Sequence, residues 1–290
     1  MFGGDSSEER VVVRPRGDST AAATTFAGEI DDATGTRIVL REPTGRRVRN
    51  LSLEEFDVVE IVARLSEGHR TGLSAFTAGD WSAAETALAV AQEAESRRWV
   101  RREILTLRCR IALAREDHLA ACTHFLKVYE SDPTTPQLRL IPLKWTSGAT
   151  DAAVARAARM WIDAPQAVGR LMGASHLLDD PTRGNEAVAT LTLLSRHDDH
   201  RIAVLASWQL FRRELSIGPI ADLSLDRRRQ QVLNLAADVR PGPSHVLGRA
   251  LAARSRSESA AAAYLWTATT GGAEGELAAR SLLEAGVALN

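Results

Sequence analysis

The first sixty residues alternate short apolar and polar runs in the way that β-strands do. The alternation predicts five short strands, with Ile38, Leu40 and Val48 pointing inward. A unit of about 50 residues buries little surface, so we expect it to dock on the chain that follows. The apolar runs, separated by Pro- and Gly-containing turns, lie at residues 11–13, 26–32, 38–40, 46–51 and 58–62.

From residue 66 onward the composition shifts to Ala, Leu, Arg and Glu, which favour helices. We expect about eleven helices, interrupted by an extended segment at 133–145, which holds three prolines, and by a break at 216–226. Short helices joined by tight turns favour stacked antiparallel pairs over a coiled coil. Candidate helix N-caps stand at Ser82 (with Glu85 completing a capping box), Asp117, Thr150, Thr182, Asp199 and Ser257.

Three stretches of the helical region can be laid on one another. In each, a small residue precedes an alanine by 12 positions, and a large apolar residue follows the alanine one helical turn later. Small residues let two helices approach closely, and we expect the large ones to fill the groove between pairs. The three sets are Gly72, Ala84 and Leu88; Cys109, Ala121 and Phe125; and Gly248, Ala260 and Tyr264.

These stretches resemble the tetratricopeptide repeat, a 34-residue helix-turn-helix unit. The fragments Gly79-Asp80-Trp81-x-x-Ala84 and Leu247-Gly248 with Ala260-x-x-x-Tyr264 carry the resemblance, whereas residues 150–215 depart from it. The stretch around 198–206 looks as much like the start of a HEAT-type helix, and a generic Ala-rich bundle is a further alternative. Both repeat interpretations imply an α-solenoid.

The strand region resembles a small SH3-like or Sm-like barrel, on the spacing of Gly28, Ile30, Gly35, Ile38 and Gly45. The predicted fold is therefore mainly α, an α-solenoid preceded by a small five-stranded barrel or meander. We place a disordered tail at 1–10, the β-domain at 11–63 and the solenoid at 64–290. The arrangement also resembles a group of uncharacterised bacterial proteins, which implies no particular activity.

Charge and composition exclude several classes of protein. A net charge of −1 argues against a nucleic-acid binder, and 44% hydrophobic with 25% charged residues argues against wholesale disorder. The two Cys cannot build a disulfide framework. No apolar run reaches the roughly 20 residues of a membrane span, and the acidic start does not look like a signal peptide. We therefore expect a cytoplasmic protein without a membrane segment.

The tetratricopeptide resemblance implies a concave groove lined by the first helix of each pair. Planar Arg forks there suit carboxylates, so the sequence predicts an interaction scaffold for an acidic peptide or protein partner. The family's dicarboxylate clamp is absent, because Leu73 and Leu107 stand at its Asn positions. Alternatively the Arg only solvate the groove or pair with acids such as Glu103. The predicted groove residues are His69, Arg70, Leu73, Thr106, Arg110, His245 and Arg249.

One alternative is a nucleic-acid-associated factor that uses an Arg face on the β-domain. Alternation along the strands would place Arg37, Arg41, Arg47 and Arg49 together, opposite Ile38, where they could hold phosphates. The charge of the region opposes this alternative, since residues 1–63 contain 8 Arg and 12 acidic residues, a balance of 8 − 12 = −4.

A second alternative is a metal protein or enzyme built around His197 and His200, which are three residues apart and can share a helix face. We favour an exposed turn there, because no third ligand stands nearby. Cys109 and Cys122 occupy packing positions and are predicted to be buried structural thiols. With no nucleophile elbow or phosphate loop, we expect neither an enzyme nor a bound cofactor.

Overall fold

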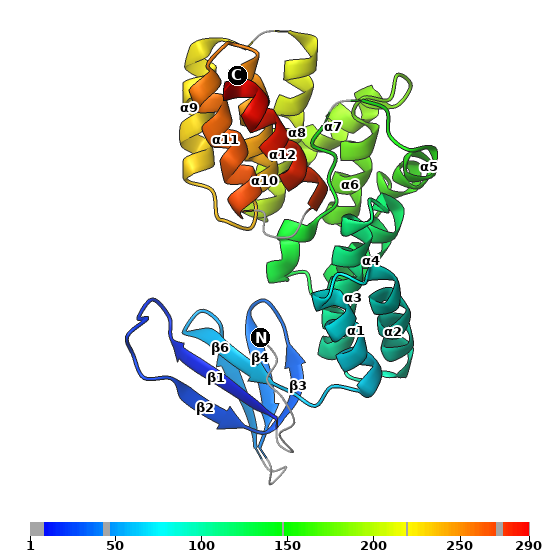
Figure 1. The fold of residues 1–290 in the computed structure, drawn as a ribbon, viewed down its shortest axis with the longest axis vertical. Helices are drawn as coiled ribbons and strands as arrows, with labels where there is room; N and C mark the ends of the chain where they lie inside the picture. Colours follow the sequence, from blue (N-terminus) through cyan, green and yellow to red (C-terminus); the bar gives the residue numbers. More distant parts are fainter. Residues whose placement is uncertain (1–8, 43–46, 147, 219, 271–274, 290) are drawn as a thin grey trace. The chain divides into compact units, whose positions relative to one another are not determined.

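The computed structural model describes residues 9–42, 47–146, 148–218, 220–270 and 275–289. The chain is mainly α-helical, with short strands at its N-terminal end (Figure 1). It divides into two compact units, residues 1–111 with 127–136 and residues 112–126 with 137–290. Most of the predicted tail at 1–10 and the turn predicted around Gly45 lie outside the described residues.

The β-region consists of two open three-stranded antiparallel sheets, with strand orders β2-β1-β6 and β3-β4-β5. The predicted closed five-stranded barrel is therefore wrong: there are six strands, and no pairing joins the sheets in the described part of the chain. The strands are β1 (Arg10–Pro15), β2 (Thr24–Ala27), β3 (Glu29–Ala33), β4 (Arg37–Arg41), β5 (Val48–Ser52) and β6 (Phe56–Val62).

Gly28 breaks the strand that the sequence predicts over 26–32 into β2 and β3. Its φ of 155° is open to glycine, and a Cβ there would lie 2.4 Å from the carbonyl oxygen of Arg41. The chain can therefore leave one sheet and enter the other only through a residue without a side chain. The prediction that Val48 points inward is also wrong, because Val48 is 57% exposed and Leu51 is the buried residue of β5.

The two sheets share one apolar core with helices of the first unit, as expected for so small a β-region. Val11, Ile30 and Leu40 from the strands join Leu88 and Ile104 from the helices in a single buried cluster. The helices of this unit are α1 (Glu67–Thr77), α2 (Trp81–Ala94) and α3 (Arg98–Ala114, of which residues 98–111 belong here).

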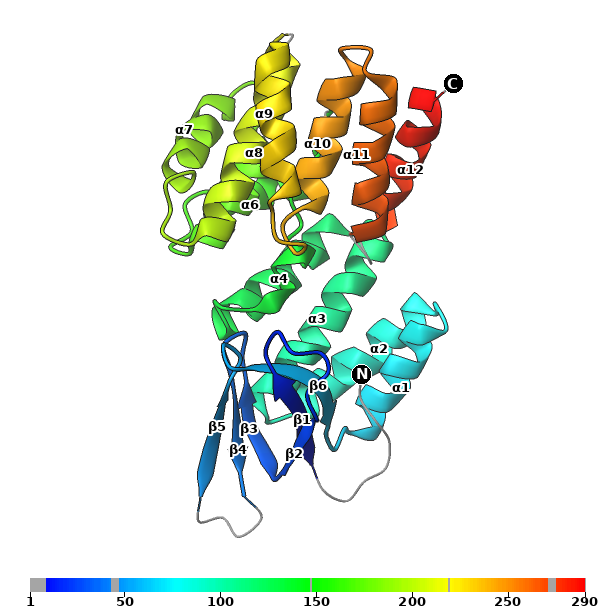
Figure 2. The ribbon, with the colours of Figure 1, turned by 90° about the vertical axis from the view of Figure 1, so that its left-hand side faces the viewer.

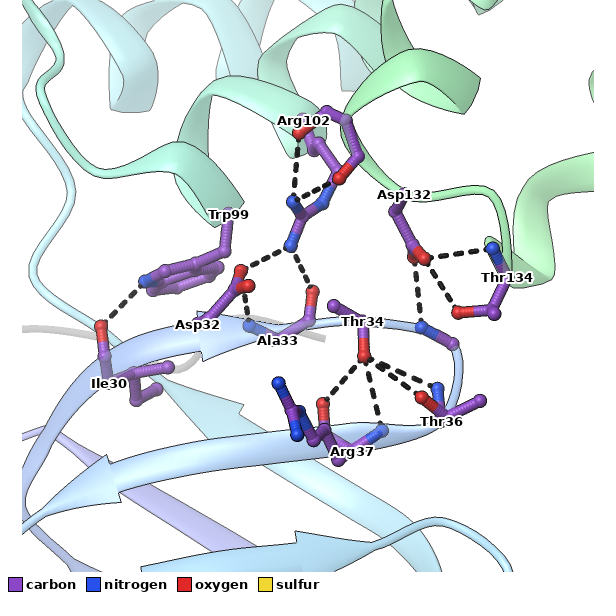
Figure 3. A network of polar contacts seen from close by, with 12 residues as sticks. Ile30, Asp32, Ala33, Thr34, Thr36, Arg37, Trp99, Arg102, Asp132 and Thr134 are labelled. Atoms are coloured by element: carbon purple, nitrogen blue, oxygen red, sulfur yellow. Dashed lines mark hydrogen bonds and ion pairs between the residues drawn. The ribbon is translucent and has the colours of Figure 1, made fainter. Parts of the chain in front are cut away.

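Polar contacts fix α3 on the β3–β4 hairpin (Figure 3). The indole of Trp99 donates a hydrogen bond of 2.9 Å to the carbonyl of Ile30. The guanidinium of Arg102, which is only 5% exposed, donates to the Asp32 carboxylate and to the Ala33 carbonyl. Because α3 holds the bulged end of β3, the hairpin is oriented by side chains as well as by apolar packing.

The tip of the same hairpin is held by Asp132, which follows α4 in the chain. Its carboxylate accepts a hydrogen bond of 2.9 Å from the backbone N–H of Gly35 and also caps the turn at Thr134 (Figure 3). A Cβ on Gly35 would lie 1.9 Å from the Thr134 carbonyl oxygen, so the two backbones touch. The hairpin is therefore clamped at its tip and along β3.

The second unit is built from two rows of helices. The helices α6, α8, α10 and α12 contact one another in succession, while α5, α7, α9 and α11 pack on them. Figure 2 shows α10, α11 and α12 side by side. The remaining bounds are α4 (His118–Ser131, shared between the units), α5 (Ala152–Trp161), α6 (Ala167–Leu177), α7 (Gly184–Leu194), α8 (His200–Ile217), α9 (Asp222–Leu233), α10 (Pro241–Ala252), α11 (Ser257–Thr270) and α12 (Gly275–Leu289).

The three hairpins singled out by the repeat pattern share one turn geometry. The turn residues Gly79, Glu116 and Ser255 have φ values of 77°, 58° and 56°. In each turn, the residue after the left-handed one donates its backbone N–H to the carbonyl five residues earlier. These hydrogen bonds join Asp80 to Ala75, Asp117 to Ala112 and Arg256 to Leu251. The internal repeat predicted from sequence therefore exists at the level of backbone hydrogen bonds.

Small residues in these hairpins lie directly under the large ones, within a pair rather than between pairs. A Cβ on Gly72 would come 2.6 Å from Leu88 Cγ, and one on Gly248 would come 2.7 Å from the Tyr264 ring. The close approach of the two helices is confirmed in these two hairpins, and that Leu88 and Tyr264 also fill grooves between pairs stays a prediction.

Helix starts follow the predicted chemistry with shifts of one or two residues. Asp199 caps α8, as predicted. Asp80 caps α2 and Asp151 caps α5, in place of Ser82 and Thr150. The shift at α2 follows from the left-handed residue Gly79, which starts the helix directly after the turn. None of the described helices combines the length and the apolar character that a membrane crossing requires.

Candidate functional site

Residues 137–145 of the predicted extended segment lie in the second unit, where the side chains of two helices bind the backbone of this segment. Residues Pro136–Leu140 form a turn of 3-10 helix in place of the extended chain predicted there. Residues 141–146 follow without helix or strand, and Asp151 caps α5. Ser175 of α6 accepts a hydrogen bond of 2.9 Å from the Lys144 N–H, and Gln209 of α8 donates to the Lys144 carbonyl at 3.1 Å. The helices thus bind this segment through its backbone, in the way that a groove binds a peptide.

Arg212 of α8 is the centre of this attachment. Its side chain is 1% exposed and donates to the Thr146 carbonyl at 2.8 Å, to the Asp179 carboxylate at 2.8 Å and to the Ser175 carbonyl at 3.0 Å. Its burial is compensated by these acceptors. The side chain of Trp145, which precedes Thr146, lies against Gly242 at the start of α10, where a Cβ would come 2.0 Å from the indole.

A cavity of about 180 Å³ lies beside this segment, within the second unit. Its floor includes the buried side chains of Leu143, Trp145 and His176, and its rim includes the exposed residues Asp151 and Arg280. The remaining lining residues are Leu113, His118, Ile141, Pro142, Lys144, Thr146, Ala149, Thr150, Val154 and Leu277. Polar groups from four elements therefore converge on one small apolar hollow.

Lys144 lines the cavity and is tied to its wall. Its ammonium donates to the Thr150 hydroxyl at 3.0 Å and to the Gly148 carbonyl, and it lies 3.7 Å from the Asp179 carboxylate. Burial lowers the pKa of Lys144, against the opposing effect of Asp179. Lys144 is one of only two lysines in the chain, but nothing in the residues around it predicts a cavity.

His176 and Cys122 meet under the cavity but do not form a catalytic pair. The Nε2 of His176 lies 3.0 Å from the Pro142 carbonyl, so this nitrogen carries the hydrogen, because a carbonyl oxygen only accepts. Burial lowers the pKa of His176 to about 4, and the imidazole is neutral at pH 7. Cys122 lies 3.9 Å from the same Nε2, which therefore cannot take its proton. Cys109 and Cys122 are both buried, as predicted, and neither forms a disulfide.

The predicted groove residues of the first unit differ in what a partner could reach. Arg70 is exposed on α1, and Leu73 is half-buried. The guanidinium of Arg110, on α3, lies 4.7 Å above the Phe76 ring of α1. His69 and Thr106 are buried, with Thr106 donating to the Arg102 carbonyl of its own helix at 2.9 Å. Arg70 and Arg110 are thus the side chains of this set that best suit contact with a ligand.

The remaining two predicted groove residues lie on α10, in the second unit. His245 is fully buried, with Nδ1 2.9 Å from the Ser281 hydroxyl of α12 and its ring centre 5.6 Å from that of Tyr264. Arg249 is half-buried one turn further on. Because the seven residues fall in two units, a groove common to all of them stays a prediction.

The Arg face predicted on the β-domain is divided by the strand register. Leu40 lies opposite Arg49, and Arg41 lies opposite Val48. Since directly opposed residues of an antiparallel pair point to the same side, Arg49 shares the side of Leu40, whereas Arg41 and Arg37 point to the other side. The prediction that the four Arg lie together opposite Ile38 is therefore wrong for Arg49.

Two of these four Arg are also engaged with acidic side chains. Arg41 lies 2.9 Å from Asp31, and Arg49 lies 3.3 Å from Glu42, with its guanidinium 4.8 Å above the Phe26 ring. Arg37 and Arg47 are exposed. Their role in nucleic-acid binding stays a prediction.

His197 and His200 lie at the turn before α8. His197 Nδ1 accepts a hydrogen bond of 3.0 Å from the Asp199 N–H, and His200 is the exposed first residue of the helix. Among the residues that the structure describes, no group of three or more His, Cys, Asp or Glu is placed to hold a metal ion.

Sequence reasoning did not single out Ser175, Gln209 and Arg212, the three side chains that bind the extended segment. Each sits within an ordinary helical pattern, and nothing local distinguishes a buried Arg from a solvated one. Comparisons of the chain with protein-family models, with curated proteins and with solved structures found no match.

Proposed function

We propose that this chain is a non-enzymatic interaction protein, an α-solenoid of tetratricopeptide-like hairpins that binds a protein or peptide partner. The observation that supports the proposal is the turn geometry shared by the hairpins at Gly79, Glu116 and Ser255. Repeated helical hairpins stack into extended surfaces, and such surfaces are used for binding.

The partner surface that we propose lies on α1 and α3 and contains Arg70 and Arg110. The two helices are linked by the contact between Arg110 and Phe76. Arg suits such a surface because its planar guanidinium matches the two oxygens of a carboxylate and also stacks on aromatic rings. An acidic extended or helical peptide therefore suits this surface best.

The extended segment favours the first unit over the second as the partner site. The side chains of Ser175 and Gln209 already bind the backbone of Lys144, and the side chain of Arg212 binds the carbonyl of Thr146. His245 is buried at the same row of helices, on α10. A partner peptide would have to displace the segment there, whereas Arg70 is exposed.

The experiment compares two charge-matched double variants in affinity capture from native lysate. Arg70→Glu with Arg110→Glu reverses the proposed surface. Arg98→Glu with Arg101→Glu makes the same change in charge at exposed positions of α3, with Arg101 on the opposite side from Arg110. A partner protein that is lost with the first variant and kept with the second supports the proposal. Equal capture by both variants contradicts it.

RNA is measured in the same eluates, because the nucleic-acid alternative makes a different prediction. The nucleic-acid alternative predicts that the amount of captured RNA falls when Arg37 and Arg47 are changed to Glu and falls at higher salt. If the amount does not change when Arg70 is changed to Glu, the binding function lies on the β-region.

A further inference from the structure

The cavity beside residues 141–151 combines a positive rim with an apolar wall. Lys144 and Arg280 bring two positive charges to it. The one carboxylate in its lining, Asp151, already accepts hydrogen bonds from the N–H groups of Ala153 at 2.8 Å and Val154 at 3.2 Å. Lys144, Arg280 and Asp151 together carry 2 − 1 = +1, and the carboxylates nearest to the two cations lie at 3.7 Å (Asp179 to Lys144) and 3.8 Å (Glu284 to Arg280).

The positive charges around the cavity act on His176, which lines it. Burial is the main cause that lowers the pKa of His176, and the positive charges of His118, Lys144 and Arg212 lower it further. Lys144 is itself partly desolvated, and its contact with Asp179 is long, at 3.7 Å. Asp179, which lies 2.8 Å from Arg212, offsets one of these positive charges, and an anion that entered the cavity would be attracted by the charge that remains.

Many of the other lining residues are apolar. Leu113, Ile141, Leu143, Val154 and Leu277 line the cavity, together with the indole of Trp145. At about 180 Å³ the space is smaller than the 300–1,000 Å³ typical of pockets for drug-sized ligands. It fits one aromatic ring or a short branched chain.

We propose that this cavity binds a small carboxylate with an apolar body. The carboxylate lies between Arg280 and Lys144, and the body lies on Trp145 and the aliphatic wall. A free organic acid and the C-terminal residue of a peptide share this chemistry. Binding here does not depend on the partner surface proposed at Arg70 and Arg110.

The first test uses phenylacetate, with phenylacetamide and acetate as matched probes. Phenylacetamide keeps the ring and removes the charge, and acetate keeps the charge and removes the ring. Titration calorimetry should show binding of phenylacetate, with both other probes at least about tenfold weaker, because each lacks one half of the recognition. Equal binding of phenylacetate and phenylacetamide, or no binding of phenylacetate and of the peptide described below, overturns the proposal.

Variants locate the binding. Arg280 is exposed on α12, so Arg280→Gln should fold normally and weaken phenylacetate binding by about tenfold or more. Arg227→Gln, at an exposed position of α9 that does not line the cavity, should leave the affinity unchanged. If both variants bind like the wild type, phenylacetate binds elsewhere and the proposal is wrong.

Trp145 supplies a readout from inside the cavity. Phenylacetate should change the tryptophan fluorescence of the wild type, and Trp145→Phe should remove that change while calorimetry still detects binding. A fluorescence change that persists in Trp145→Phe contradicts the assignment. A short peptide that ends in Phe with a free carboxylate, compared with its C-terminal amide, distinguishes the two sources, since only the free terminus should bind if a peptide end is the ligand.

Discussion

Gly248 on α10 lies directly beneath the ring of Tyr264 on α11, so that a Cβ at this glycine would come 2.7 Å from two ring carbons. The same relationship links Gly72 to Leu88 in the first hairpin. In both hairpins the glycine permits an approach that no other residue allows, and a large side chain covers it. The two hairpins therefore share a packing contact between a glycine and a large side chain, as well as the geometry of their turns.

Gly248→Ala should lower the free energy of unfolding by about 1–3 kcal/mol, because the ring of Tyr264 has to move. Gly286→Ala is the matched control, since a Cβ there meets nothing within 4 Å on α12 and alanine favours a helix by about 1 kcal/mol over glycine. Urea unfolding should move the midpoint in opposite directions for the two variants. Stabilisation by Gly248→Ala would show that the close approach is not required.

The turn residues predict a stabilising substitution. Glu116 has φ 58°, in the left-handed region that favours glycine, and Gly79 occupies the same place in the first hairpin at φ 77°. Glu116→Gly should raise the free energy of unfolding by about 1 kcal/mol, and Gly79→Ala should lower it by a similar amount. Thermal unfolding of both variants measures this. If Glu116→Gly destabilises the chain, Glu116 does not adopt the left-handed conformation on which this prediction depends.

Arg212 should be the most costly single substitution in the second unit. Arg212→Met removes the hydrogen bonds to Thr146 and Ser175 and leaves the Asp179 carboxylate with only the distant Lys144, so we expect a loss of about 3–5 kcal/mol. The extended segment should also open. Hydrogen exchange followed by mass spectrometry should report faster exchange over residues 141–150. Unchanged exchange there would mean that apolar packing alone holds the segment.

Stability should fall on mild acidification. Burial lowers the pKa of His245 to about 4, below the ordinary value of about 6.5. The unfolded chain therefore takes up the proton first as the pH falls. The stabilisation is complete above about pH 6.5 and is lost as the pH drops to about 4, which amounts to about 3 kcal/mol. Urea unfolding between pH 7 and 4 should show a shallower slope for His245→Gln. An identical slope would contradict this assignment.

The coarse fold could be read from the sequence because it follows from local patterns. The shift from β-branched runs to Ala, Leu, Arg and Glu near residue 64 separates strands from helices, and the small-to-large spacing revealed the repeated hairpins. The turn at Glu116 was found although no glycine marks it, since the flanking Cys109 and Ala121 keep the register.

The arrangement of the β-region could not be read, because it depends on pairing between distant strands. The positive φ at Gly28 and the register that sets Leu40 opposite Arg49 decide which sheet each strand joins and which face each Arg takes. Neither the φ at Gly28 nor the pairing register can be read from a short stretch of sequence. Likewise Arg212 looks like any helical Arg until the extended segment is folded against it, so the cavity beside Lys144 has no sequence signature of its own.

The most direct test of the interaction function is the dissociation constant of the captured partner, measured by calorimetry with the purified chain. Reversing Arg70 and Arg110 to Glu should weaken binding by about 100-fold, because charge-assisted hydrogen bonds are replaced by repulsion. Reversing Arg98 and Arg101 should change it by less than about threefold, as exposed charges away from a contact contribute little. If both double variants bind the partner as tightly as the wild type, α1 and α3 do not form the binding surface and the proposed function is wrong.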